Sequence, residues 1–308
     1  MPLGELIINI FTSALPCCLL ALGIFLTYRL LDFADLTAEG SFLVGGAICA
    51  TIIFKGGNAF LATIVGALGG ALCGLVTGLL NTKLRIPKLL SGIITMTAAT
   101  SITLLIIGAA KDNSVFANLV TLHATDHTIF SYFFINGINN RIIEVIVMAV
   151  TVVLVTLLVY YFFGTEYGMA IRATGMNAQM ARAQGINSER ATIICVAISN
   201  ALIGMAGALF AQDARSIDIK SSSGFLVVGL ASILIGEAIF GKNSFKNWII
   251  SVVLGAVVYF VIINVAIALG FPTQLKNLLY AVLITIALCI PLIKSLFKKK
   301  GGAVHARN

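Results

Sequence analysis

The stretch IIEVIVMAVTVVLVTLLVYYFF, residues 142–163, decides the class of fold. It contains one charged residue, Glu144, near its start. A helix needs about 20 apolar residues to cross a hydrocarbon layer of roughly 30 Å. A helix on the surface of a soluble protein would carry a charged face along its whole length. The stretch therefore predicts a transmembrane helix.

The composition of the whole chain supports the same class. Among its 308 residues, 59% are hydrophobic and 10% are charged, and the mean hydropathy is +1.04. Soluble domains have about 25% charged residues. This excludes a secreted enzyme, a nucleic-acid-binding protein and a disordered scaffold. All six cysteines lie inside apolar runs, which is typical of small core residues and not of a disulfide framework.

Similar apolar runs recur along the chain, and together they predict an all-α, polytopic membrane protein with about nine transmembrane helices, within a range of eight to ten. The second and seventh runs are the weakest. The predicted spans are Leu6–Tyr28, Leu36–Phe54, Ala59–Leu80, Leu89–Ala109, Ile142–Phe163, Ala191–Ala211, Phe225–Phe240, Trp248–Leu269 and Leu278–Ile293.

The distribution of basic residues predicts the orientation of these spans. With nine spans and the C-terminus inside, 14 of the 20 lysines and arginines fall on the inner side and six on the outer side. Cytoplasmic loops carry the excess of basic residues. We therefore expect a multi-pass protein of the cell membrane, with its N-terminus outside and its C-terminus in the cytoplasm.

The chain is predicted to form a single transmembrane domain, residues 1–308, with two long loops and a basic tail. An outer loop, residues 111–141, carries several aromatic side chains and is expected to pack over the outer mouth. Residues 164–190 form the one long inner segment. The basic tail, residues 294–308, is expected to lie at the lipid surface.

No catalytic, metal-binding or cofactor-binding pattern is predicted. The run GEAIFGKN, residues 236–243, approaches a phosphate-binding loop, but Asn243 replaces the required serine or threonine. The run also closes an apolar helix and does not join a strand to a helix. We interpret it as a chance match, so the chain is not expected to hydrolyse ATP itself.

Four glycines recur at every fourth position in the third span: Gly66, Gly70, Gly74 and Gly78. This spacing leaves a bare strip on one helix face, where a neighbouring backbone can approach closely. Helix packing is the favoured interpretation, and a part in the substrate path is the alternative.

Acidic residues cluster between the first two spans, in DFADLTAEG, residues 32–40. Ionisable groups near membrane depth are costly and indicate function by default. Two interpretations stay open. The residues form a cytoplasmic turn with solvated acids, or the second helix is interrupted there and lines a central pathway. The pathway candidates are Asp32, Asp35, Glu39 and Gly40.

The inner segment predicts a short helix that lies across the membrane surface. Residues 166–183 lack proline, Gly185 is expected to end the helix, and Asn187 or Ser188 to cap the next one. One face collects Met169, Ala173, Met176 and Met180 at helical spacing. Such a face suits docking into a protein groove, or it lies on the protein's own helices or on lipid.

The run GMAIRATGMN, residues 168–177, with Ala181 and GIN at 185–187, resembles the coupling segment of permeases of ATP-binding-cassette (ABC) importers. The resemblance is to the branched-chain amino acid and ribose permease family, and it covers most of the chain. SNALIG at 199–204 and GAL at 207–209 fit the same pattern. The form of residues 32–40 is similar to a subset of the family associated with tryptophan or tyrosine.

This resemblance implies a transport subunit without its own ATPase site. Its partners would be a cytoplasmic ABC ATPase that binds the ATP, an extracytoplasmic binding protein, and a second permease subunit, as a homodimer. The solute would be small and polar, an amino acid, and an aromatic one if the subset resembled by residues 32–40 applies. The resemblance assigns the ATPase contact to Gly168, Arg172, Ala173, Gly175, Asn177, Ala181, Gly185, Ile186 and Asn187, with Gly175 and Gly185 as bend points.

Two other functions are compatible with the residues alone. An ion-coupled secondary transporter also uses broken helices near the membrane midplane, and Asp35 and Glu39 would then hold its coupling ion. A membrane scaffold or receptor subunit is the third possibility, although it would have no use for a coupling segment.

Overall fold

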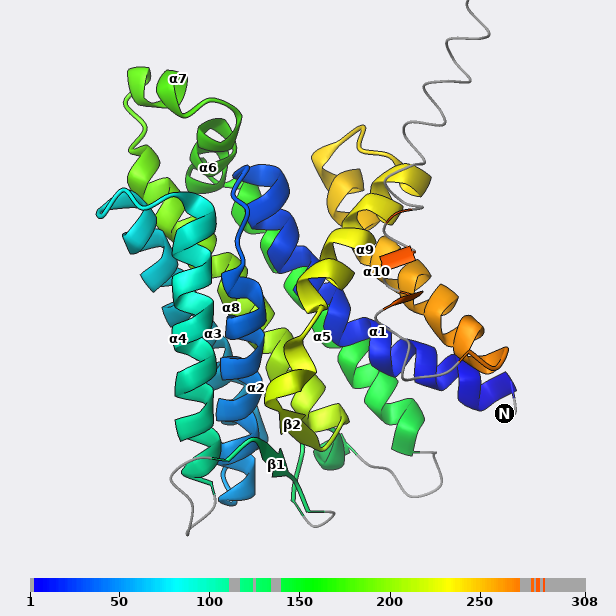
Figure 1. Ribbon diagram of the computed structural model, residues 1–308. Coiled ribbons are helices and arrows are strands. Elements are labelled where there is room, and N and C mark those ends of the chain that lie inside the picture. Colours follow the sequence, from blue (N-terminus) through cyan, green and yellow to red (C-terminus); the bar gives the residue numbers. More distant parts are fainter. Residues whose placement is uncertain are drawn as a thin grey trace, which may run out of the picture.

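The computed structural model describes residues 3–110, 117–123, 126–133 and 140–271, and also residues 278, 279, 281, 282 and 285 (Figure 1). Nearly all of the regular structure in these residues is helical. The all-α fold predicted from the apolar runs is confirmed.

Within these residues, seven helices are long and apolar enough to cross a membrane. Each of them coincides with a predicted span to within a few residues. They are α1 (Leu3–Phe25, continued by the π-helical turn η1, Leu26–Leu30), α2 (Thr37–Phe54), α3 (Ala59–Thr82), α4 (Lys88–Gly108), α5 (Asn140–Gly164), α8 (Ser188–Asp213) and α10 (Phe245–Ala268).

Two of the nine predicted spans are not among these seven helices, so the predicted count of nine is approximate. The seventh is the helix α9, Phe225–Phe240, which has 16 residues and is shorter than a full span. The ninth, residues 278–293, falls largely outside the described residues, and the basic tail at 294–308 falls wholly outside them.

The helices pack around two central members, α8 and α1. Helix α8 lies against α3, α2 and α1, and α2 also contacts α3 and α4. Helix α1 runs obliquely through the molecule and packs against α10, α9 and α5, while α9 and α10 pair with each other (Figure 1). The fully buried side chains of Leu19, Leu20, Phe25 and Phe42 lie where these groups meet.

The connections gather at two opposite ends of the bundle. At one, which we call the coupling end, lie the α3–α4 turn, the α9–α10 turn and two short helices, α6 (Glu166–Met176) and α7 (Ala178–Ala183) (Figure 1). At the other, the ribbon end, β1 (Leu119–Thr121) pairs antiparallel with β2 (Ser216–Asp218). The short helices η2 (Phe130–Phe133) and η3 (Ile219–Ser222) follow β1 and β2 along the chain.

The chain between α1 and α2 is not helical. Residues 31–36 lead from η1 to the start of α2, and Leu31, Phe33 and Asp35 are buried within them. Helix α2 then continues without interruption from Thr37 to Phe54. The non-helical residues therefore precede the second span and do not divide it.

Candidate functional site

The inner segment, residues 164–190, is built from capped short helices. The Thr165 side chain caps α6 by accepting from the Gly168 N–H. The Asn177 side chain caps α7 by accepting from the N–H groups of Gln179 and Met180, each at 3.0 Å. The Asn187 side chain caps α8 by accepting from the Arg190 N–H at 3.0 Å. Asn187 is one of the two residues predicted as this cap. These caps satisfy backbone donors that a helix start leaves free.

Three glycines shape this segment in different ways. A β-carbon on Gly175 would collide with the carbonyl oxygen of Leu30, so α6 touches the end of η1 backbone to backbone. A β-carbon on Gly168 would collide with the backbone of Phe162 and Phe163. Gly185 has a φ of +84°, a left-handed conformation that ends α7, and the N–H of Ile186 reaches back to the Ala181 carbonyl at 3.0 Å.

The bend inside the segment differs from the expected one. Gly175 lies within α6, and the chain turns two residues later at Asn177, whose φ and ψ are −158° and 99°. A polar cap explains the difference. The Asn177 side chain caps the start of α7, and this hydrogen bonding competes with continuation of α6. Gly175 is required for close packing, and Gly185 is the left-handed end of α7.

Arg172 and the alanines hold the segment to the bundle. The Arg172 guanidinium lies over the Phe245 ring, 4.3 Å from its centroid, and links α6 to the start of α10. Ala181 is buried, Ala173 accepts from the Asn177 N–H at 3.0 Å, and Ile186 is half-buried. These contacts make α6 and α7 a compact unit attached to the coupling end.

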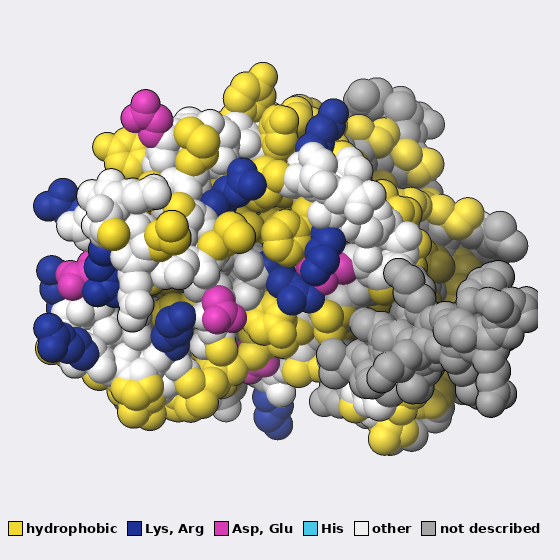
Figure 2. Space-filling view, turned by 90° about the horizontal axis from the view of Figure 1, so that it is seen from above, with side chains coloured by type: hydrophobic (Ala, Val, Ile, Leu, Met, Phe, Trp, Pro, Cys, Tyr) yellow, Lys and Arg dark blue, Asp and Glu magenta, His cyan; other side chains and the backbone are white. Residues whose placement is uncertain are grey.

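The methionines of this unit point away from the protein. Met176 is 89% exposed and Met180 is 62% exposed, and Met169 is exposed as well. Figure 2 views this end of the molecule and shows hydrophobic side chains standing among Lys and Arg on it. We call Met169, Met176 and Met180 the methionine ridge. Packing of these three methionines against the protein's own helices is therefore excluded, whereas docking into a protein groove and contact with lipid both stay open.

Asp35 is the centre of a buried polar network. Its side chain accepts from the Asn200 Nδ2 at 2.7 Å and from the Thr37 N–H at 2.8 Å, and the residue is 5% exposed. The Ser41 hydroxyl donates to the Asn200 Oδ1 at 2.6 Å. Burial raises the pKa of the Asp35 carboxyl, and its hydrogen bonds from Thr37 and Asn200 oppose that rise. The network joins residues 31–36 to α8.

The other three pathway candidates lie in different places. Asp32 is exposed with a φ of 49°, and its carbonyl accepts from the Lys88 Nζ at 2.8 Å. Glu39 is half-buried and accepts from the Gly224 N–H, at the start of α9, at 3.1 Å. Gly40 packs against the backbone of Met96 in α4. The four pathway candidates therefore do not form one cluster: Asp35 belongs to the buried polar network, and the other three lie outside it.

Three of the four regularly spaced glycines of α3 face α8, and Gly66 faces both α2 and α8. A β-carbon on Gly74 would lie 2.5 Å from the Val196 carbonyl, and one on Gly78 would lie 3.0 Å from the Ile193 Cα. A β-carbon on Gly70 would collide with the Asn200 carbonyl of α8, and one on Gly66 would lie 2.7 Å from the Gly45 carbonyl of α2. Close helix packing accounts for the position of all four.

Two groups of residues were not singled out from the sequence. Asn200 and Ser41 complete the Asp35 network. The available signals were the amide inside the apolar run of α8 and its place in the SNALIG run, to which no role was assigned. At the coupling end, Glu237 accepts from the Arg29 Nη2 at 2.5 Å and from the Trp248 Nε1 at 2.8 Å. This second cluster ties η1 to α9 and α10. Its members come from three separate elements, so their meeting depends on the tertiary fold.

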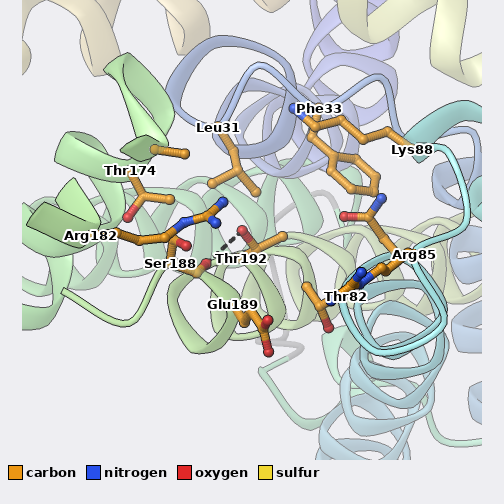
Figure 3. Close-up of a pocket in the computed structure, with 12 residues that line it drawn as sticks. Leu31, Phe33, Thr82, Arg85, Lys88, Thr174, Arg182, Ser188, Glu189 and Thr192 are labelled. Atoms are coloured by element: carbon orange, nitrogen blue, oxygen red, sulfur yellow. Dashed lines mark hydrogen bonds between the residues drawn. The ribbon is translucent and has the colours of Figure 1, made fainter. Parts of the chain in front are cut away.

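A cavity of about 500 Å³ opens beside the inner segment (Figure 3). Its walls come from residues 31–36, the α3–α4 turn, α6, α7 and the first turn of α8. Figure 3 shows Arg182 reaching into it from one side and Arg85 from the other, while Glu189 points away. Glu189 is paired outside the cavity with Lys83, at 3.2 Å.

Comparison with known proteins identifies the family. The family described as the permease component of the branched-chain amino acid transport system matches residues 6–288. The chain belongs to this permease family. A tyrosine transport system permease protein of Clostridioides difficile is 33% identical over 90% of this chain and 88% of its own length. A galactofuranose transporter permease protein of Escherichia coli is 27% identical over 94% of this chain and 79% of its own length.

Family membership confirms the resemblance seen in the coupling motif. The protein is a permease of ABC-importer type and not an enzyme, because the ATPase of such importers is a separate subunit. The near-match to a phosphate-binding loop has a packing explanation, since Gly236 lies inside α9 against the Ser251 carbonyl of α10. Neither a secondary transporter nor a scaffold is supported by these relatives.

Proposed function

We propose that the permease docks a cytoplasmic ABC ATPase through its inner segment, which we call the coupling segment (residues 164–190). The observation that carries this proposal is the methionine ridge. Three flexible, polarisable side chains stand exposed on a unit that is otherwise capped and packed against the bundle. Methionine-rich faces adapt well to grooves on a partner protein. We propose that the ATPase contact is formed by the residues of this segment to which the family resemblance assigns it.

The contacts of the coupling segment provide a route for movement. Gly175 touches the Leu30 carbonyl, and residues 31–36 continue from there to Asp35. Asp35 is hydrogen-bonded to Asn200 in α8. A displacement of α6 driven by the ATPase would therefore push directly on the entry to α2 and, through Asp35, on α8. Packed elements of this kind shift between discrete arrangements and do not deform continuously.

The solute is proposed to be an amino acid, and an aromatic one by similarity to the tyrosine permease of C. difficile. An extracytoplasmic binding protein would deliver it to the ribbon end. A second copy of the permease would complete the pore. The coupling end would then face the cytoplasm, with the N-terminus outside, in the bacterial cell membrane. The excess of basic residues at the coupling end supports this orientation.

Co-purification tests the docking proposal. The tagged permease is expected to retain its ATPase in detergent, and the double substitution Met176→Glu with Met180→Glu is expected to release it, because two charges would be buried in the interface. Deletion of residues 169–182, or Gly185→Trp, is expected to release it as well. Leu269→Glu is the matched control, since Leu269 is 84% exposed at the far end of α10. Full retention after the deletion would contradict the proposal.

A further inference from the structure

The cavity beside the coupling segment has an unbalanced positive lining. Three cationic side chains, Arg85, Lys88 and Arg182, line it, and Glu189 is the one acid among its lining residues. The Glu189 carboxylate already lies 3.2 Å from the Lys83 Nζ. In the part of the chain that the structure describes, neither Arg85 nor Arg182 forms a hydrogen bond or an ion pair through its guanidinium group.

Backbone dipoles add to this positive field. Ser188 and Glu189 belong to the first turn of α8, and Lys88 is the first residue of α4, so the starts of two long helices border the cavity. Helix N-termini carry a partial positive charge that favours anions. The Lys88 Nζ is engaged with the Asp32 carbonyl at 2.8 Å, which keeps its charge beside the cavity. The lining therefore suits a compact anion with several acceptor oxygens.

Exposed apolar residues lie next in the sequence to two of the cationic lining residues. Leu84, which precedes Arg85, is 66% exposed, and Leu89 and Leu90, which follow Lys88, are exposed as well. Apolar side chains that project beside free cations at the end of a membrane-spanning helix match the boundary between acyl chains and headgroups. Figure 2 shows Lys and Arg gathered on the part of the coupling end that includes this turn.

We propose that the cavity binds the phosphate of an anionic phospholipid headgroup and that this headgroup fastens the coupling segment to the α3–α4 turn. Guanidinium groups form paired, charge-assisted hydrogen bonds with phosphate oxygens. Arg182 belongs to α7 and Arg85 to the α3–α4 turn, so one phosphate between them would join two elements that are far apart in the sequence. The lipid would act on the part of the permease that contacts the ATPase, and in this respect the inference rests on the proposed function.

The experiment measures lipid binding by the purified full-length permease without its ATPase, so its result does not depend on docking. The protein is reconstituted in phosphatidylcholine vesicles with and without phosphatidylglycerol. Phosphatidylglycerol is expected to raise the thermal unfolding midpoint, and native mass spectrometry is expected to find it retained. Arg85→Gln with Arg182→Gln should weaken retention by about tenfold, since charge-assisted hydrogen bonds are the strong ones. Each single substitution should give an intermediate loss.

Lys242→Gln with Lys246→Gln is the matched control, because it removes two exposed charges from the α9–α10 turn and the first turn of α10, at the same end. This variant should retain phosphatidylglycerol like the unchanged protein. Equal retention by both double variants would overturn the proposal, since the attraction would then come from general surface charge. A further arm adds inorganic phosphate to phosphatidylcholine vesicles. If free phosphate raises the midpoint as much as the lipid does, the lipid assignment is wrong.

Discussion

At the scale of single residues, Asp35 shows how one acid can connect distant parts of the permease. Its two carboxylate oxygens accept from Asn200 in α8 and from the Thr37 N–H at the start of α2. A buried polar group is tolerated only when its hydrogen bonds are satisfied, and removal of one partner costs about 1–3 kcal/mol. The sequence marked Asp35 as unusual because it is an acid near membrane depth. It did not reveal Asn200, since nothing in the local pattern of α8 pairs that amide with residue 35.

The substitution Asp35→Asn is expected to lower solute uptake and leave ATPase retention intact. An amide has a single oxygen acceptor, so one of the two hydrogen bonds would be lost and its donor left buried. Asp32→Asn is the control, because Asp32 is exposed and asparagine tolerates its positive φ. Glu39→Gln should have a smaller effect than Asp35→Asn, since glutamine can still accept from the Gly224 N–H. Normal uptake and a normal unfolding midpoint in Asp35→Asn would contradict the proposed route.

At the scale of the helices, the apolar runs predicted most of what the structure contains. Seven long helices match predicted spans, because about 20 apolar residues in sequence have few alternatives to a membrane helix. Two features could not be predicted. The strands β1 and β2 have three residues each, too few for a periodic pattern, and they pair across a long separation in sequence. The split of the coupling segment at Asn177 depends on a side-chain cap that competes with helix continuation.

The glycine face of α3 leads to a prediction about stability. Gly70→Leu is expected to destabilise the permease by about 1–3 kcal/mol, because the added side chain would force α3 away from the Asn200 and Gly204 backbone of α8. Leu72→Ala, on the exposed face of the same helix, should change stability much less. Thermal unfolding in detergent compares the two variants. A Gly70→Leu protein as stable as Leu72→Ala would show that the close approach of α3 to α8 is not required.

At the scale of the whole molecule, the two ends of the bundle differ in what they carry. The coupling end holds the methionine ridge, the cationic cavity and the Arg29–Glu237 pair, whereas the ribbon end holds β1 and β2. The coupling segment meets the core through Gly175 and Arg172, so it is attached at defined points. The proposed docking of an ATPase therefore depends on which side of the membrane this end faces.

Cysteine labelling measures that side directly. Met176→Cys and, separately, Leu269→Cys are placed in a variant without native cysteines, and spheroplasts with a sealed membrane are treated with a membrane-impermeant maleimide. Both positions are highly exposed, at 89% and 84%. The account predicts that the Met176→Cys protein reacts only after the membrane is permeabilised, while Leu269→Cys reacts from outside. Reaction of Met176→Cys in sealed spheroplasts would place the coupling segment outside the cell and contradict the account.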